Sequence, residues 1–469
     1  MDKGISYSAR KEEAIEEFRY ILDTYILPLI QHNGDLAPVI SPSPITYNKH
    51  VSLKDVGSDH ELLFYPALST PQFYFKIHTK STNQDLGAAE QILREILRVS
   101  RFDFRKPNFS AKQMYDKNNV YRNALFDAAF EVGLCNWIGS ELIYELIVQL
   151  REWSQKTYEG NHMPFGFIVD VNKGSTGTID YLSFLKSNHS AVFTDGISSG
   201  IKLDYKGRIV KYFSSVQERQ SSNNEHVPWT PYEYIDFANI CHSENGSNWI
   251  GVIMQSNGDM MIFKSMGLSF VKRNGKWMRL DSYTIHNTIR NRFRPRLPEE
   301  SESTYEMLSK KFADEVFLSV LDTSFAHSGG CIAIIDDENV DFVQRNSFPN
   351  DSLVNNSMPS KKKDIIKRLI DTGSIDQGKT VFQSLDRKLR LELLSLDGAT
   401  VLDSTGRILC AGAIVKIEGG SEGGGRLAAA KELAKSGLAM KISMDGSIQC
   451  FEGKRQGNSI EAVETFKTL

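Results

Sequence analysis

The stretch "LLSLDGATVLDSTGRILCAGAIV", residues 393–415, decides the fold of the second half of this chain. Two apolar segments of strand length flank the polar turn "DSTGR", a pattern that predicts a β-hairpin. The first segment follows Asp397, and the small residues Gly398 and Ala399 would let a ligand lie against the backbone. A carboxylate at the rim of such a surface can bind a divalent metal ion or accept a proton from a hydroxyl group. The alternative interpretation is an ordinary Asp-Gly turn at the start of a strand.

A glycine-rich stretch, "EGGGRLAAAKELAKSG", follows at residues 422–437. Its alanine-rich part predicts a helix over 427–436 with Gly437 as the C-cap. The backbone N–H groups of glycines, together with the positive end of the helix dipole, favour an anion, and an arginine in the first turn can bind phosphate through two parallel hydrogen bonds. The residues of this candidate anion site are Gly423, Gly424, Gly425 and Arg426. A flexible surface hairpin is the alternative interpretation.

The segments around these two motifs alternate between helix and strand patterns. Apolar residues from Tyr305 to Phe325 repeat with helical spacing, and "CIAIID", residues 331–336, is a short apolar strand. The polar stretch 337–362 predicts a surface loop, and "LAMKISMDGSIQCF", residues 438–451, predicts a closing hairpin. This order indicates an α/β (α+β) domain.

The first half of the chain begins with helix patterns and continues with strands. The helix patterns cover residues 11–31, 87–100 and 136–154. Strand and hairpin patterns follow between residues 165 and 280. Residues 290–304 combine charges, prolines and serines, which is typical of a solvated linker, although their four arginines could also contact nucleic acid. We therefore predict an N-terminal α+β domain at 1–295, a linker at 296–303 and a C-terminal domain at 304–469.

The two halves share a faint internal similarity. "FGFIVDV" followed by "FTDGISSGIKLDYKGRIVKY" resembles "GGCIAIID" followed by "SLDGATVLDSTGRILCAG". Each pair contains a strand pattern, an Asp-Gly dipeptide, a second strand and a turn with "GRI". The N-terminal domain could therefore be a divergent relative of the C-terminal domain, and the alternative is that unrelated hairpins share such patterns.

Composition excludes several classes of protein. A net charge of −3 gives no reason to expect nucleic acid or an anionic membrane as a partner. The five cysteines lie far apart without a CxxC pair, which argues against a zinc site and a disulfide framework. The chain has no apolar run long enough to span a bilayer, and its first residues lack the apolar core of a signal peptide. We therefore expect a cytoplasmic protein.

A second stretch competes as a nucleotide site. "GSIDQGKT", Gly373 to Thr380, matches the GxxxxGK[ST] pattern of a P-loop, in which Lys379 and Thr380 would contact phosphates and a metal ion. A P-loop follows a buried strand, whereas "KKKDIIKRLIDT" before it has the apolar spacing of a helix. The context therefore favours a chance match, and a P-loop ATPase stays the second alternative function.

The order of motifs in the C-terminal third resembles a known family. "LDGATVLDSTGRILCAG" is similar to the DGA motif and following hairpin of the diadenylate cyclase (DAC) domain, which condenses two ATP into the second messenger cyclic di-AMP. The strand "GGCIAII", the segment "GGGRLAAAKELAKSGLAMKIS" and the hairpin "MDGSIQCF" follow that domain's order, so the resemblance covers about residues 304–455. The family's second motif, Arg-His-Arg preceded by Thr, is replaced here by residues 423–426, of which only Arg426 keeps a charge.

The resemblance implies a mixed central sheet flanked by helices and a set of site residues. Asp397 would be the catalytic residue and would bind Mg²⁺ or Mn²⁺, and the backbone at Gly398 and Ala399 would contact the adenosine. Residues 423–426 would hold phosphates, and Ser443 and Asp445 would complete the nucleotide site. It also implies ATP as substrate, a homo-oligomer with DAC domains face to face, and a sensor or regulatory role for the N-terminal domain. A catalytically inactive nucleotide sensor of the same fold is the first alternative.

Overall fold

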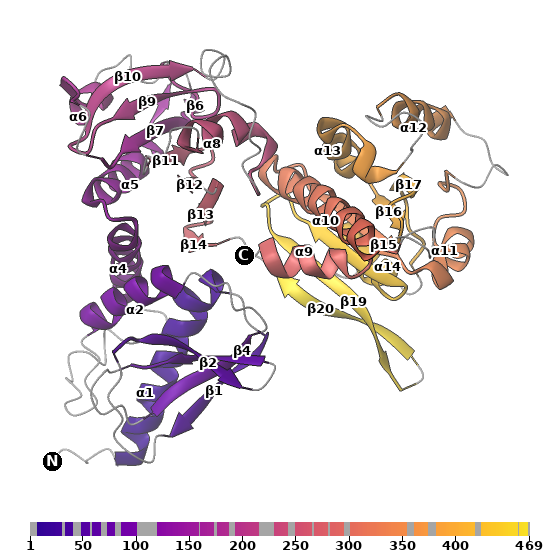
Figure 1. Cartoon of the computed structure of the whole chain (residues 1–469), viewed down its shortest axis with the longest axis horizontal. Helices are drawn as coiled ribbons and strands as arrows, with labels where there is room; N and C mark the ends of the chain where they lie inside the picture. Colours follow the sequence, from indigo (N-terminus) through magenta and orange to yellow (C-terminus); the bar gives the residue numbers. More distant parts are fainter. Residues whose placement is uncertain are drawn as a thin grey trace. The chain divides into compact units, whose positions relative to one another are not determined.

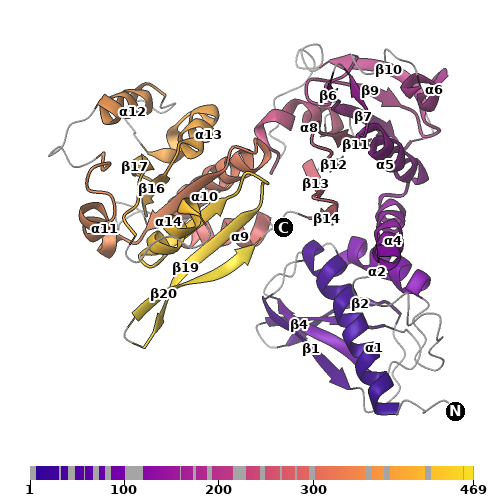
Figure 2. The same ribbon diagram turned by 180° about the vertical axis from the view of Figure 1, so that it is seen from behind.

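A computed structural model of the chain describes residues 7–30, 33–40, 48–56, 59–66, 73–79, 86–100, 120–158, 160–172, 176–186, 193–214, 229–242, 249–264, 267–279, 282–294, 301–353, 361–373, 381–417, 424–457 and 459–467. The chain forms two compact units (Figures 1 and 2). Unit 1 comprises Met1–Val227 and Asp236–Asp281, and unit 2 comprises Pro228–Ile235 and Ser282–Leu469. Each unit combines helices with open sheets, so the α/β (α+β) fold class is confirmed.

The N-terminal part of unit 1 is a four-stranded antiparallel sheet with order β1-β4-β3-β2. Its strands are β1 (Asn33–Ile40), β2 (Val51–Val56), β3 (Asp59–Phe64) and β4 (Phe73–Thr79). The helical elements of this part are α1 (Tyr7–Ile21), the π-helical turn η1 (Leu22–Ile26), the 3₁₀ turn η2 (Leu27–Leu29) and α2 (Leu86–Ser100). Phe18, on α1, packs its ring against Phe73 and Phe75 of β4, so α1 closes the apolar face of this sheet.

A second sheet of unit 1 has eight strands in the order β14-β13-β12-β11-β7-β9-β10-β8. The strands are β7 (Phe165–Asp170), β8 (Ile179–Asp180), β9 (Ser199–Leu203), β10 (Arg208–Ser214), β11 (Trp249–Met254), β12 (Met260–Lys264), β13 (Gly267–Arg273) and β14 (Lys276–Met278). The other elements are α4 (Val120–Ile138), α5 (Glu141–Trp153), the two-stranded ribbon β5 (Thr157–Tyr158) and β6 (Asn161–His162), α6 (Tyr181–Leu185) and α8 (Ile235–His242). Strands β7 and β9 are parallel, and every other neighbouring pair is antiparallel.

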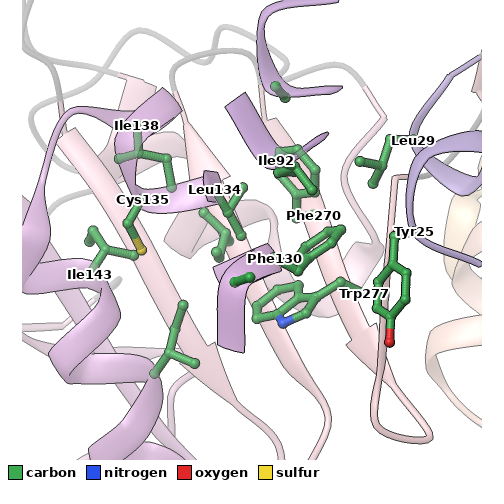
Figure 3. Packing of buried hydrophobic residues seen from close by; sticks show 14 of the residues in the cluster. Tyr25, Leu29, Ile92, Phe130, Leu134, Cys135, Ile138, Ile143, Phe270 and Trp277 are labelled. Atoms are coloured by element: carbon green, nitrogen blue, oxygen red, sulfur yellow. The ribbon is translucent and has the colours of Figure 1, made fainter. Parts of the chain in front are cut away.

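Helix α4 connects the two parts of unit 1 through one apolar core (Figure 3). The Phe130 ring stacks on Trp277 at 6.3 Å between centroids, and Trp137 meets Phe270 edge to face. Gly133 lets α4 approach α2 closely, since a Cβ there would lie 2.5 Å from the Cα of Ile92. The helix predicted over 136–154 is in fact the end of α4 and all of α5, because Gly139, with φ +84°, breaks the chain direction between them.

One buried carboxylate ties α4 to the edge of the second sheet. Glu131 is only 1% exposed and accepts hydrogen bonds from Lys272 Nζ at 2.8 Å and Trp277 Nε1 at 3.1 Å. Arg151, on α5, also pairs with it. Burial alone would raise the pKa of Glu131, but Lys272, Trp277 and Arg151 outweigh burial and hold that pKa below its usual value.

Unit 2 contains a six-stranded mixed sheet with order β17-β16-β15-β18-β19-β20. Its strands are β15 (Gly330–Ile335), β16 (Ala399–Asp403), β17 (Ile408–Ala413), β18 (Gly437–Ile442), β19 (Ile448–Gln456) and β20 (Ser459–Lys467). Its helical elements are η4 (Tyr232–Tyr234), α9 (Ser282–Arg290), α10 (Glu302–Phe325), η5 (Asp337–Asn339), α11 (Val340–Asn346), α12 (Lys361–Thr372), η6 (Phe382–Ser384), α13 (Arg387–Ser395) and α14 (Gly425–Ala434). Strands β15 and β16 are parallel, and the other neighbours are antiparallel.

Helices cover both faces of this sheet, as the family resemblance implied. Cys331, Ala333 and Ile335 on β15 share an apolar cluster with alanines of α14. The helices α10 and α13 pack together, and α13 contacts β15, β16 and β17. The predicted loop 337–362 is wrong in its described part, because Val340–Asn346 is helical and buries Val343 in the same cluster.

The boundary between the units lies earlier than the predicted linker. Helix α9 belongs to unit 2, where Arg290 Nε donates to Ser309 Oγ at 3.2 Å and Phe293 packs on Phe312 at 5.4 Å. Arg292 binds Asp336 and Glu452, so this arginine stabilises unit 2 instead of being a solvated linker residue. Residues 295–300, most of the predicted linker, lie outside the described residues.

The two larger sheets repeat one strand order. Six strands of the unit 1 sheet lie in the order β13-β12-β11-β7-β9-β10, and the unit 2 sheet has the equivalent order β20-β19-β18-β15-β16-β17. The pairs that are parallel or antiparallel are the same in both sheets. The turns after β9 and β16 also match. Asp204 Oδ2 accepts from Arg208 Nε at 2.9 Å, and Asp403 Oδ2 accepts from Arg407 Nε at 3.1 Å. The internal similarity seen in the sequence therefore corresponds to a repeated topology.

Candidate functional site

Strand directions bring the predicted site residues to one edge of the unit 2 sheet. β15 and β16 both begin there, and β17 and β18 end there, since Gly330 pairs with Ile442 and Ala399 pairs with Ala413. We call this the Asp397 edge. It is formed by residues 327–330, 396–399, 412–413, 424–426 and 443–446. Five segments far apart in the sequence therefore converge, which is the usual way in which a fold assembles a binding site.

Asp397 stands in the short connection between α13 and β16. Its side chain is exposed, and no hydrogen bond or ion pair of its carboxylate occurs among the residues that the structure describes. Gly398 has φ +106°, and a Cβ there would lie 2.5 Å from Ala413 O and 2.7 Å from Gly412 C. Only glycine fits this position, so the backbone beside the carboxylate is fixed against β17.

In unit 1, the Asp-Gly pair Asp195-Gly196 precedes β9 as Asp397-Gly398 precedes β16, but the Asp195 carboxylate is hydrogen-bonded. Asp195 Oδ1 accepts from the backbone N–H groups of Ile197, Ser198 and Ser199 at 3.0, 2.8 and 2.9 Å. Its other oxygen accepts from the Ser198 hydroxyl. Burial would raise the pKa of Asp195, but these hydrogen bonds outweigh it and lower the pKa. The Asp195 carboxylate is thus used within its own turn, whereas that of Asp397 faces solvent.

Arg426 lies at the start of α14, as predicted. Gly424 is the N-cap with φ 95° and ψ 154°, a region open only to glycine, and the helix begins at Gly425. The guanidinium lies against the loop before β15, because a Cβ on Gly329 would be 2.7 Å from Arg426 Nη1. Its Nε is buried and has no hydrogen-bond partner among the described residues. Gly423 lies outside the described residues.

Gly437 does not cap this helix. The C-cap residue is Lys435, and Gly437 is the first residue of β18. A Cβ at Gly437 would lie 2.1 Å from Ile334 O, so the glycine permits the close approach of β18 to β15. The predicted C-cap was therefore wrong, although the predicted helix is present.

Ser443 and Asp445 lie in the turn between β18 and β19. Asp445 Oδ1 accepts from Ser447 N at 2.9 Å and Ser447 Oγ at 2.8 Å, so its carboxylate shapes the turn. Ser324, on α10, donates a hydrogen bond to Gly446 O and thereby holds this turn at the Asp397 edge. Met444, between the two predicted residues, is 69% exposed and offers an apolar surface.

Two polar residues at this edge were not predicted from the sequence. His327 has φ +50°, and its Nδ1 lies 3.0 Å from Met444 O. Lys362, on α12, donates from Nζ to the carbonyl of Gly412, beside Gly398, and its side chain is 50% exposed. The sequence does point to His327, because "HSGG" ends a long helix just before a buried strand. Lys362 is 35 residues from Asp397, and only tertiary packing brings it to the Asp397 edge.

The P-loop match has the wrong context. Helix α12, not a strand, precedes Gly373, as the sequence pattern indicated. Asp386 N donates to Gly373 O at 2.9 Å, which fixes this glycine beside the start of α13. Lys379 and Thr380 lie outside the described residues.

A divalent cation at the Asp397 edge would need ligands from a nucleotide. Nowhere in the described ranges do three or more His, Cys, Asp or Glu side chains gather as a metal cluster. Mg²⁺ is commonly bound by one or two carboxylates together with phosphates and water, and the solvent-facing carboxylate of Asp397 is compatible with that arrangement. Within the same described ranges, no helix has the length and hydropathy needed to cross a membrane.

The chain matches no protein-family model, and no curated protein matches it.

Proposed function

We propose that unit 2 binds ATP at the Asp397 edge and, facing a second copy of itself, condenses two ATP into cyclic di-AMP. The observation that supports this proposal is that two separate segments of the chain, Asp397–Ala399 and the start of α14 with Arg426, lie at the same edge of the sheet. A triphosphate needs positive charge and backbone donors, and the reaction needs a carboxylate close to them.

Each group has a proposed role. Arg426 and the N–H groups at the start of α14 bind phosphates. Lys362 adds a second positive charge beside Gly398. Asp397 holds the divalent cation, Mg²⁺ or Mn²⁺, and the cation when bound neutralises charge on the phosphates. Met444 provides an apolar surface for the adenine.

The proposed reaction balances over the two subunits. The 3′-hydroxyl oxygen of each ATP attacks the α-phosphorus of the other ATP, so two new P–O bonds form. The two bonds between the α- and β-phosphates break, and two pyrophosphates leave. Each hydroxyl proton is lost to Asp397 or to solvent. Because each protomer supplies one attacking hydroxyl and one α-phosphate, two copies must face each other for the reaction to occur.

A nucleotide sensor of the same fold is the second candidate function. Its supporting observation is the low charge of the edge, where Arg426 and Lys362 are the cations identified among the described residues and residues 423–425 are glycines. A sensor needs only binding, whereas catalysis also needs stabilisation of the charge that develops in the transition state.

Mass spectrometry of the reaction products separates the two functions. The full chain is incubated with ATP and Mn²⁺, beside Asp397→Asn and the control Asp371→Asn, an exposed aspartate on α12. Cyclic di-AMP from the wild type and the control, but not from Asp397→Asn, supports the cyclase. Saturable ATP binding without product supports the sensor. Neither binding nor product would reject both.

A further inference from the structure

A short segment whose two ends continue into unit 1 packs into unit 2. We call residues Trp229–Ile235 the strap. Val227, before it, and Asp236, after it, belong to unit 1, whereas the strap itself belongs to unit 2. Trp229 has φ +55°, and its ring lies edge to face against His286 and Phe317, each at 5.0 Å between centroids. Thr230 and Tyr234 are buried, so the strap is anchored in unit 2 at these two residues.

The strap completes the hydrogen bonds of a buried ion pair. Arg387 donates to both oxygens of Asp322, each at 2.7 Å, and Asp322 is 2% exposed. The same guanidinium donates to Thr230 O at 2.7 Å, and Tyr232 N donates to Asp322 Oδ1 at 2.8 Å. A buried pair of this kind stabilises a structure only while its remaining donors and acceptors have partners. The strap provides one partner to each charge.

Arg387 is also the first residue of the helix that leads to Asp397. α13 spans nine residues from Arg387 to Ser395, and Asp397 follows two residues later. Arg390 Nε donates to Ser319 Oγ at 3.1 Å and Ser395 Oγ to Ser328 Oγ at 2.8 Å, so the helix is attached along its length to α10 and to the loop before β15. The helix is about 14 Å long, and because packed interiors transmit strain, a shift of its first turn is passed along the helix toward Ser395 and Asp397.

We propose that Arg387 is a positioning residue for Asp397, and that the strap makes the Asp397 edge responsive to unit 1. When the strap is seated, Asp322 and Arg387 hold the first turn of α13 and Asp397 stands at its place before β16. A change in unit 1 that draws the strap away removes Thr230 O and Tyr232 N from the pair. The first turn of α13 then loosens, and Asp397 loses its fixed position. The role of Arg387 in positioning Asp397 does not depend on the proposed function. The expected effect of this positioning on nucleotide affinity does rest on the proposed function.

Hydrogen exchange of the full chain without any ligand tests the positioning. Arg387→Lys keeps the charge but loses the two-pronged geometry. Trp229→Ala leaves both charges in place and weakens only the seating of the strap. The control is Arg292→Lys, which alters a similar ion pair beyond the other end of β15. We expect exchange in peptides covering 396–399 to rise about tenfold in Arg387→Lys and in Trp229→Ala, the value of one charge-assisted hydrogen bond, and to stay unchanged in the control.

A second measurement separates this inference from the proposed function. ATP affinity is determined for the same variants, and we expect it to fall about tenfold in Arg387→Lys and Trp229→Ala at an unchanged stoichiometry. If the wild type binds no ATP, the proposed function fails, while the exchange result still tests the positioning. Exchange at 396–399 that is equal in Arg387→Lys and Arg292→Lys, and unchanged in Trp229→Ala, would overturn the inference. If Arg387→Lys does not fold, the Trp229→Ala result decides alone.

Discussion

Three glycines at the Asp397 edge differ in what an alanine would cost, and this difference can be measured. Gly398→Ala places a Cβ at φ +106° and 2.5 Å from Ala413 O. The positive φ costs about 1–2 kcal/mol and the overlap about 1–3 kcal/mol, so we expect a loss of about 2–5 kcal/mol. Gly424→Ala, at φ +95° and ψ 154°, meets no atom within 4 Å and should lose only the backbone cost of that region, about 1–3 kcal/mol. Gly425→Ala, in open space without a positive φ, should gain up to about 1 kcal/mol of helix propensity.

The assay follows hydrogen exchange of β15 and β18 peptides against urea, because these strands lie at the centre of the unit 2 sheet. With a slope of about 2 kcal/mol per molar urea, a loss of 3 kcal/mol lowers the midpoint by about 1.5 M. We expect the urea midpoint to be highest for Gly425→Ala, lower for Gly424→Ala and lowest for Gly398→Ala. A Gly398→Ala midpoint equal to that of Gly424→Ala would refute the close packing of Gly398 against β17.

Three further predictions concern charge and thiols. Glu131→Gln should cost about 3 kcal/mol at neutral pH, because it removes a buried carboxylate from its cations. Folding lowers the pKa of Glu131 from 4.5, so its contribution to stability is present above about pH 4.5 and is lost as the pH falls through the lower, folded pKa. The gap between the urea midpoints of wild type and variant should therefore narrow as the pH is lowered below 4.5, and a gap that widens on acidification would contradict this. Lys362→Met should weaken ATP binding about tenfold in a titration, whereas its helix neighbour Lys361→Met should not, and equal effects of the two would argue against a specific contact. All five cysteines are buried and free, and burial raises the pKa of Cys135, Cys331 and Cys450 to about 12. The native protein should therefore react with a thiol reagent only after denaturation. Fast labelling of the native chain would contradict the burial of these thiols.

The local patterns in the sequence were sufficient for the elements around the site. The helix ending at Phe325, the strand that follows it and the hairpin after Asp397 depend on periodicity and turn residues within a few positions, and all are present. The helix predicted over 427–436 is also present, although it begins two residues earlier, at Gly425, and ends at Ala434. The order of the motifs also predicts that Asp397 and Arg426 belong to one site, and the strand directions place both residues at the same edge of the sheet.

What the sequence could not predict depends on contacts between distant segments. The strap follows β10 in the sequence and ends at the first residue of α8, yet Thr230 and Tyr232 bind the Asp322–Arg387 pair in unit 2. Lys362 reaches Gly412 only because α12 folds back over the end of β17. The spacing of apolar residues in the sequence does not predict such contacts, because each contact depends on how distant elements pack against one another.

The most direct test of the account is an ATP titration of the full chain by calorimetry, with wild type, Arg426→Ala and the control Lys435→Ala at the other end of α14. Lys435 forms an exposed pair with Glu432 and lies away from the Asp397 edge. We predict saturable binding to the wild type and to the control, and a loss of about 1.5–3 kcal/mol for Arg426→Ala, or about ten- to 150-fold in affinity, because a charge-assisted phosphate contact is removed. Binding that is equal in Arg426→Ala and in the wild type would contradict a nucleotide site at the Asp397 edge.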